Sequence, residues 1–587
     1  MEPKRPTASL EALLEEKFNG VPPVTPFFFK LPGQKVIEED LSFASEYFYK
    51  YRLLETAKFC AELNSALGNS TESDSLARLR FISENSESAQ GRFEFHRLMP
   101  KVEKARKARV TQLRALFDLR EFKKCAFLAK ESLDRSPDPH TLYFFAYSVI
   151  LREQVSREEA GSDKSSPLEL SREVEEAEQL LTRFDARDEL PDILVFLLGL
   201  IKRDRRDFPS AAKLFARALN LNPFFWTAWL ELAKLLADQG VPASFASLGG
   251  LAPHWFKNFF TAQLLLENVR ANEKYEVFCF DFALGLLAFF PQSGFLFHFL
   301  ASLFFNKPDY DRALEFFQRL MKVDPYRYEG LDLLSNLLYV KENENELGKL
   351  AVMCFENDKY LPETCCVLGN YYSLVGERSK AATYFKRAIS LDRGFLPAYI
   401  LLGHEFLELK NVPSSIESYN QAIQINPRDY RGWYGLGLAY ELQHHFQFAL
   451  YYFLEAISLN PRDSRMWNAL GSCYDKMGKK NESMKCLEKS EGLMDQEGIS
   501  LFQLGKMYDQ LGLVSKAVQC FEENIANKDK FKEMDKQLAD SLIYLAKYYS
   551  QQNDKEKAAA YANRLLDFHG FPKEEAQNLL FEICQNK

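Results

Sequence analysis

Residues 430–476 read YRGWYGLGLAYELQHHFQFALYYFLEAISLNPRDSRMWNALGSCYDK and contain the same frame twice, 34 residues apart. In each copy a tryptophan lies three residues before a Leu-Gly pair, and a tyrosine lies three residues after it. The Leu-Gly pair recurs at this spacing through residues 362–520, with its glycines at Gly369, Gly403, Gly437, Gly471 and Gly505. Chance is a poor explanation for five copies in one register.

Each copy has the pattern of two packed helices. On the first helix the tryptophan, the leucine and the tyrosine fall at i, i+3 and i+7, so all three lie on one face. The second helix presents small and aromatic residues, such as Ala449, Phe453 and Ala456, and the glycine lets it approach closely. This is the tetratricopeptide pattern. We predict an all-α superhelical solenoid of tetratricopeptide repeats, because a pair of helices with these apolar faces buries them by stacking on neighbouring helix pairs.

The register also predicts how the 587 residues are organised. We expect a flexible N-terminal arm at residues 1–38, an N-terminal helical half at 39–240, a joint loop at 241–255, a C-terminal superhelix at 256–570 and a capping helix at 571–587. A charged insertion at 152–190 interrupts the N-terminal half. The residues expected to hold the repeats together are the five glycines with Trp433 and Trp467.

Two further segments allow two interpretations each. The serine-rich, acidic segment 69–90 fits a solvated linker or a phosphorylation region. Residues 101–109 carry five basic side chains in nine, which fits the exposed face of a helix or a partner-binding stripe.

Composition excludes several classes of protein. A net charge of -8 and a pI near 5.8 argue against a general nucleic-acid binder, which would carry a basic field. None of the ten cysteines has CxxC spacing, so we expect reduced core thiols. The first nine residues lack the apolar core of a signal peptide, and the most apolar stretches are shorter than the roughly 20 residues that span a bilayer.

Catalytic motifs are not found. The sequence has no phosphate loop, GxSxG, HExxH or dinucleotide fingerprint. His444 and His445 are adjacent and point to different helical faces, which disfavours a metal site. Cys365 and Cys366 fit two core thiols better than a strained vicinal disulfide. We expect no catalytic residue, no metal and no cofactor, and therefore place function in the surfaces.

The short sequence segments between the repeat-defining residues identify a protein family more specifically than the repeat pattern does. They include DPYR at 324–327, DKYLPETCCVLGNYYSL at 358–374, GHEFLELKN at 403–411, RDYRGWYGLGLAYE at 428–441, NPRDSRM at 460–466, WTAWLELAKLLAD at 226–238 and RLLETAKFCAEL at 52–63. In these words the chain resembles the family of subunit eight of the anaphase-promoting complex, named for cell-division-cycle mutant twenty-three.

The resemblance implies a non-catalytic scaffold subunit of a multisubunit ubiquitin ligase that acts in mitosis, in the nucleus and cytoplasm. In that family the N-terminal repeats homodimerise, and the C-terminal superhelix receives the C-box of the coactivator, an arginine-containing peptide. Neighbouring scaffold subunits pack on the outside. The implied partners are thus other subunits, the coactivator and a second copy, with no nucleic acid and no membrane.

In such arrays the first helix of each pair lines the groove, so the residues beside the frame positions are the candidates for peptide binding. They are Asn370, Ser373, His404, Glu408, Tyr434, Leu438, Glu441, Asn468, Ser472 and Asp475. A peptide arginine would favour carboxylates and amides with an aromatic ring nearby. The alternative for any one of them is an ordinary solvated side chain.

Two other functions fit a repeat array. One is an adaptor or co-chaperone that binds another peptide, such as a C-terminal EEVD carboxylate. That grip needs a lysine where Cys366 stands, and the candidate groove residues here are acidic. The other is the regulatory repeat region of an enzyme such as a glycosyltransferase, which the missing catalytic motifs oppose.

Overall fold

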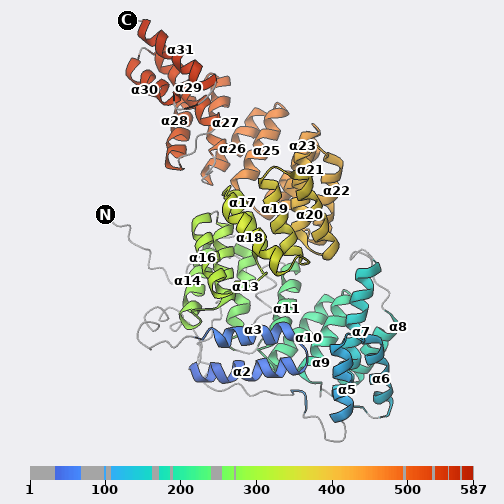
Figure 1. Cartoon of the computed structure of the whole chain (residues 1–587). Helices are drawn as coiled ribbons and strands as arrows, with labels where there is room; N and C mark the ends of the chain where they lie inside the picture. The colour runs from blue at the N-terminus through green and yellow to red at the C-terminus, as the bar shows by residue number, and fades with distance from the viewer. Residues whose placement is uncertain are drawn as a thin grey trace, which may run out of the picture. The chain divides into compact units, whose positions relative to one another are not determined.

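The computed structural model describes residues 34–67, 98–100, 107–135, 137–160, 171–185, 190–239, 251, 254–269, 273–307, 309–493, 498–531, 536–552, 554–566, 568 and 571–585. Within these ranges every regular element is a helix, 28 in all (Figure 1). The predicted all-α fold class is confirmed. No helix among the described residues is both long and apolar enough to cross a membrane.

The chain divides into two compact units, Met1–Leu337 and Leu338–Lys587. The boundary between the units lies within α17 (Leu331–Val340). Most of the expected joint, 241–255, is outside the described residues, so the predicted domain bounds stay a prediction. The first 33 residues of the expected arm, all of the segment 69–90 and residues 101–106 of the basic stripe also lie outside the described residues.

The second unit is a succession of helix pairs that follows the 34-residue register. Its helices are α18 (Glu344–Asn357), α19 (Pro362–Leu374), α20 (Arg378–Leu391), α21 (Leu396–Glu408), α22 (Val412–Ile425), α23 (Tyr430–Leu442), α24 (Phe446–Leu459), α25 (Ser464–Lys476), α26 (Lys480–Gly492), α27 (Ile499–Gln510), α28 (Val514–Phe531), α29 (Lys536–Gln551), α30 (Lys555–Leu565) and α31 (Phe571–Gln585). Each helix packs on the next along the chain, and α31 packs on α29 and α30.

The frame glycine stands where the two helices of a pair are closest. A Cβ atom on Gly437 of α23 would lie 2.4 Å from the ring of Phe453 on α24. On Gly471 of α25 its nearest neighbour would be the side chain of Leu487, at 3.0 Å, with the carbonyl oxygen of Ser483 at 3.5 Å. The aromatic residue of the second helix therefore occupies the space that the missing side chain leaves.

The frame tryptophans fix the turn before the first helix. The indole Nε1 of Trp433 donates to the carbonyl oxygen of Pro427 at 2.8 Å, and that of Trp467 donates to Pro461 at 2.9 Å. In the first unit Trp229 makes the same bond to Pro223 at 2.8 Å. Trp229 is buried, whereas Trp433 and Trp467 are half-buried.

The first unit contains less regular pairs. Its helices are α2 (Gln34–Lys50), α3 (Leu54–Ser65), α5 (Lys107–Asp118), α6 (Phe122–Arg135), α7 (Pro139–Ala160), α8 (Arg172–Asp185), α9 (Asp192–Asp204), α10 (Phe208–Leu221), α11 (Trp226–Gln239), α13 (Lys257–Val269), α14 (Glu273–Phe289), α15 (Gly294–Asn306) and α16 (Tyr310–Val323). Part of the expected charged insertion is helix α8, which packs on α7 and α9. Its charges mask an apolar stripe of Val174, Ala177 and Leu181 at i, i+3 and i+7.

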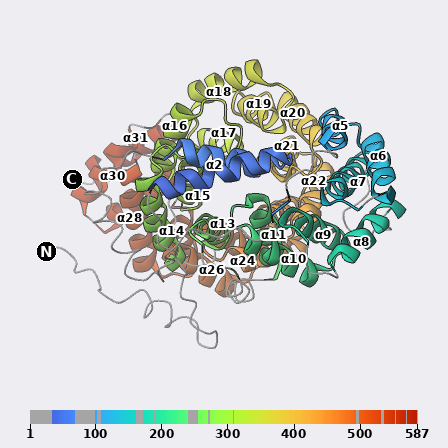
Figure 2. The ribbon, with the colours of Figure 1, turned by 90° about the horizontal axis from the view of Figure 1, so that it is seen from below.

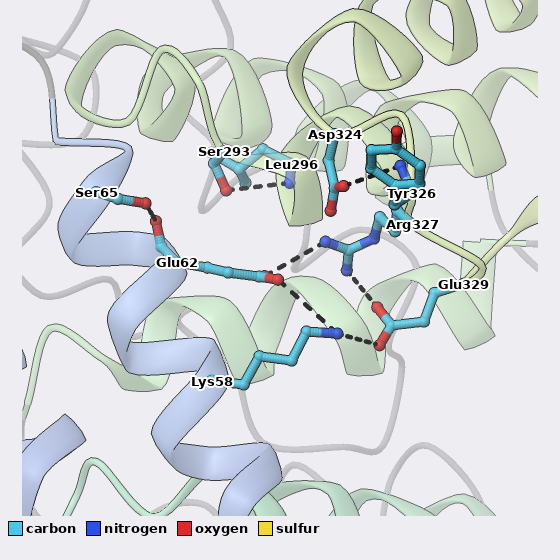
Figure 3. Close-up of polar contacts among 9 residues, drawn as sticks. All are labelled: Lys58, Glu62, Ser65, Ser293, Leu296, Asp324, Tyr326, Arg327 and Glu329. Atoms are coloured by element: carbon cyan, nitrogen blue, oxygen red, sulfur yellow. Dashed lines mark hydrogen bonds and ion pairs between the residues drawn. The ribbon is translucent and has the colours of Figure 1, made fainter. Parts of the chain in front are cut away.

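The pair α2/α3, blue in Figures 1 and 2, lies beside helices distant in sequence. The ring of Phe59 on α3 stacks on Trp226 of α11, with centroids 4.0 Å apart, and meets Phe259 and Phe295 edge-on. Figure 3 shows that Lys58 and Glu62 point from α3 toward the turn after α16. There Glu62 pairs with buried Arg327 at 3.3 Å, and Lys58 pairs with Glu329 at 3.2 Å.

A buried carboxylate joins three parts of the first unit. Tyr47 on α2 donates to Oδ1 of Asp192 at 2.7 Å, and Asn222 donates to Oδ2 at 3.0 Å. The backbone N–H of Met99 donates to the Tyr47 hydroxyl at 3.1 Å. Burial raises the pKa of Asp192 to about 6, against the hydrogen bonds, which lower it.

We predict that Gly437→Ala lowers the free energy of unfolding by about 1–3 kcal/mol, because the new methyl group overpacks against the Phe453 ring. Gly471→Ala is the matched control and should cost less than about 1 kcal/mol, since Leu487 can shift and alanine favours the helix. Denaturant unfolding measures both. Equal losses would contradict the close-contact role of the glycine.

We predict a pH-dependent cost for Asp192→Asn. The folded-state pKa of about 6 lies above the ordinary aspartate value, so the contribution of Asp192 to stability falls as the pH rises from about 4 to about 6. An asparagine at position 192 does not titrate, so its contribution to stability does not change with pH. Its NH₂ group would also face the NH₂ group of Asn222, which lowers the free energy of unfolding by about 1–3 kcal/mol. Urea unfolding should therefore show a larger cost at pH 5 than at pH 7.5. A cost independent of pH would contradict the raised pKa.

Candidate peptide-binding surface

The predicted peptide-binding residues lie on four consecutive first helices of the second unit. Asn370 and Ser373 are on α19, His404 and Glu408 on α21, Tyr434, Leu438 and Glu441 on α23, and Asn468, Ser472 and Asp475 on α25. In a repeat array these first helices stack side by side, so residues 34 positions apart occupy equivalent places in successive repeats.

Two of the four helices are joined by a carboxylate that the sequence analysis missed. Glu405 on α21 is buried, and its Oε1 accepts a hydrogen bond of 2.5 Å from the hydroxyl of Ser373 on α19. Its Oε2 lies 3.9 Å from the guanidinium of Arg378 and has no hydrogen-bond partner among the residues that the structure describes. Burial raises the pKa of Glu405, partly offset by Ser373 and Arg378.

A signal for Glu405 was present in the sequence. The positions 34 residues before and after it are Tyr371, Ala439 and, one repeat further, Cys473. A glutamate at a position that other repeats give to aromatic or small residues is an ionisable group in a packed site. Such buried charges mark functional sites more often than exposed ones do.

Glu408 lies at the outer end of the same cluster. It is exposed, and its carboxylate pairs with Arg378 at 3.2 Å. Arg378 thus stands between two carboxylates, and the three charges sum to -1 when both glutamates are ionised. A second cation can therefore be accommodated beside them.

The other predicted carboxylate, Glu441, belongs to a separate cluster. It pairs with Lys476 at 2.7 Å and accepts a long hydrogen bond from Ser472 at 3.5 Å. The structure thus places Ser373 and Glu408 in one cluster and Glu441 and Ser472 in another. Asp475 is exposed at the end of α25.

His404 carries no positive charge at neutral pH. Burial, with Arg431 and Arg465 nearby, lowers its pKa to about 4. Its Nδ1 is 2.9 Å from the hydroxyl of Tyr419, the residue whose ring faces Gly403. This neutral imidazole positions the tyrosine and does not repel a cationic peptide.

The remaining candidates differ in exposure. Asn370 and Asn468 are buried, 2% and 5% exposed, so they line the packed base of the surface and not its rim. Tyr434 and Leu438 are half-buried, and the Tyr434 ring lies 5.8 Å from that of Phe453. Within the described ranges no group of three or more His, Cys, Asp or Glu side chains is placed to hold a metal ion.

Comparison with known proteins bears on both units. Residues 36–301 match the family described as anaphase promoting complex subunit 8 / Cdc23. The predicted resemblance to this family is confirmed. Residues 332–577 match a second family, the C-terminal tetratricopeptide domain of cilia and flagella-associated protein 70.

Several curated relatives carry the first family's name, among them the following three. The chain is 33% identical to anaphase-promoting complex subunit 8 of Arabidopsis thaliana over 308 residues, 51% of this chain and 50% of the relative. It is 35% identical to subunit 8 of Dictyostelium discoideum over 229 residues, 39% of this chain and 38% of the relative. It is 34% identical to subunit CDC23 of Saccharomyces cerevisiae over 241 residues, 38% of each chain. The chain thus spans half or less of the length of these relatives.

Among solved structures, the Cut9-Hcn1 hetero-tetramer of the anaphase-promoting complex aligns with 82% of this chain and 96% of its own. The TM-score is 0.43 and the sequence identity is 16%.

Proposed function

We propose that the protein is a non-catalytic tetratricopeptide scaffold subunit of the anaphase-promoting complex, a ubiquitin ligase that drives mitosis in the nucleus and cytoplasm. The observation that carries the proposal is the match of residues 36–301 to the subunit 8 / Cdc23 family, together with relatives of that name at 33–35% identity. Affinity purification of the full chain from its own cells should return cullin-like and RING-containing subunits. Their absence would contradict the proposal.

The proposal includes a homodimer formed through the N-terminal half, residues 39–240, as in the family that the chain resembles. The chain has a mass of 67.9 kDa, so light scattering on the purified full chain should give twice this value. A value of 67.9 kDa at micromolar concentration would contradict the dimer while leaving the subunit assignment intact.

The proposal further includes a binding site for the coactivator C-box on the second unit. Glu405 and Glu408 would receive the guanidinium of the peptide arginine beside Arg378, since two carboxylates there face one cation. The Ser373 hydroxyl holds Glu405 in place. A guanidinium bound by a carboxylate in a desolvated position gains a stronger charge-assisted hydrogen bond than it would at an exposed one.

We predict that Glu408→Lys combined with Glu441→Lys abolishes binding of an arginine-containing C-box peptide, because each change reverses a charge on the surface. Glu408 forms an exposed ion pair, so its change should cost no more than about 1 kcal/mol. The Glu441 side chain is 12% exposed and pairs with Lys476, so its reversal should cost more stability than the change at Glu408. The matched control is Glu417→Lys on α22, which makes the same charge reversal at an exposed position outside the surface. A fluorescence-anisotropy titration measures affinity. Unchanged affinity in the double variant would remove both residues from the site.

We predict that Glu405→Gln lowers the affinity for the same peptide at least tenfold at pH 7.5 without lowering the unfolding temperature. The amide keeps the hydrogen bond from Ser373 and loses only the charge. Burial raises the pKa of Glu405, so the ionised form is lost on acidification at a higher pH than for an ordinary glutamate. Wild-type affinity should therefore fall on acidification, and that of Glu405→Gln should fall less. Parallel pH profiles would contradict a role for the Glu405 charge.

A further inference from the structure

The outer side of helix α24 has an unusual composition. Phe448, Tyr451 and Leu454 are 60%, 53% and 45% exposed. Only one residue of the whole helix, Glu455, carries a formal charge. We call these three exposed side chains the α24 patch.

The repeat register supplies an internal comparison, because residues 34 apart occupy equivalent places. The equivalents of the α24 patch are Ser414, Glu417 and Asn420 on α22, and Glu482, Lys485 and Glu488 on α26. All six are polar or charged. Packing of the array therefore does not require apolar side chains here, and α24 departs from its neighbours for another reason.

The same comparison applies to the frame aromatic residue beside the patch. In two other repeats a lysine eight residues later covers this ring: Lys380 lies 5.5 Å from the Tyr372 centroid, and Lys516 lies 5.5 Å from that of Tyr508. For Tyr440 the residue eight positions later is Phe448, and the two ring centroids are 5.6 Å apart. A charged cover is thus replaced by an exposed ring.

The rings of the patch are held in place by their neighbours. Tyr440 stacks on Tyr452 with centroids 5.3 Å apart and planes inclined by 1°. Tyr451 meets Tyr452 edge-on at 5.2 Å. These contacts restrict the rings of Phe448 and Tyr451 before binding and so reduce the side-chain entropy lost on binding.

We propose that the α24 patch binds an uncharged, apolar face of an α-helix from another protein. The lack of charge on the patch favours this occupant: a charged group placed over these three side chains would lose its hydration and meet no opposite charge on them. The spacing fits a helix laid along α24, since residues 448, 451 and 454 extend over about 9 Å at 1.5 Å per residue.

Area limits what the α24 patch contributes to an interface. A fully exposed aromatic side chain offers on the order of 200 Å², so three half-exposed side chains offer roughly 300 Å². A stable interface needs about 800 Å² from each partner. The patch is too small to hold any partner by itself, so the protein whose helix it binds must contact the chain elsewhere as well.

Photo-crosslinking in the cells of origin tests the proposal. Benzoylphenylalanine is placed in the full chain at Tyr451, or at its register equivalents Glu417 and Lys485 as matched controls. We expect at least tenfold more intermolecular adduct at position 451, and a crosslinked peptide from a different protein with an uncharged stripe at i, i+3 or i+4, and i+7. Equal yields at the three positions, an adduct with another copy of the chain, or a charged crosslinked face would overturn the proposal.

A transplant of residues from α22 gives a second test. The variant Phe448→Ser, Tyr451→Glu, Leu454→Asn gives α24 the residues that α22 carries at the same register positions. Its unfolding temperature should stay within about 2 °C of the wild-type value. The amount of the partner identified by crosslinking that co-purifies with the variant should fall at least tenfold. Binding of an arginine-containing peptide to the candidate surface should not change, which separates this inference from the proposed function. Co-purification at the wild-type level would overturn the proposal.

Discussion

The close contact between a glycine on the first helix and an aromatic ring on the second is the constraint on which the array depends. It recurs as Gly369 with Phe385, Gly403 with Tyr419, Gly437 with Phe453 and Gly505 with Phe521. In each pair an added Cβ atom would come within 2.4–2.8 Å of the ring, closer than real Cβ atoms approach. The aromatic ring fixes the distance and rotation of the two helices, so the next pair stacks in the same way. Four of the five copies hold the register through this contact, and Leu487 takes the place of the ring beside Gly471.

A constant register makes the repeats comparable with one another. What the fold requires recurs in most copies, and what appears in one copy alone needs a different reason. Glu405 is such a residue, because a buried carboxylate replaces tyrosine, alanine and cysteine at the same position. The apolar side chains on α24 are another case, at positions where the adjacent repeats are polar. Both kinds of site are surfaces carried by an otherwise uniform scaffold, which fits a protein that acts through binding.

The sequence was sufficient to predict the fold wherever the frame is complete. The helix pairs from α19 to α28 follow the 34-residue spacing, because the Leu-Gly pair and the aromatic ring are local features. Helix α8 was missed because its charged residues mask the stripe of Val174, Ala177 and Leu181. The contacts of α3 with Trp226 and Arg327 could not be predicted, because they join residues more than 160 positions apart. For the candidate site, the sequence identified the helices and several side chains, but not the pairing of Glu408 with Arg378 or of Glu441 with Lys476, since partners depend on side-chain direction.

The most direct test of the binding account is hydrogen–deuterium exchange on the full chain with and without an arginine-containing C-box peptide. Binding beside Glu405 should slow exchange in α19 and α21, the two helices that Ser373 and Glu405 join, and leave α8 and α31 unchanged. Protection confined to the first unit would contradict the account. So would a lack of protection when further peptide produces no further change in exchange.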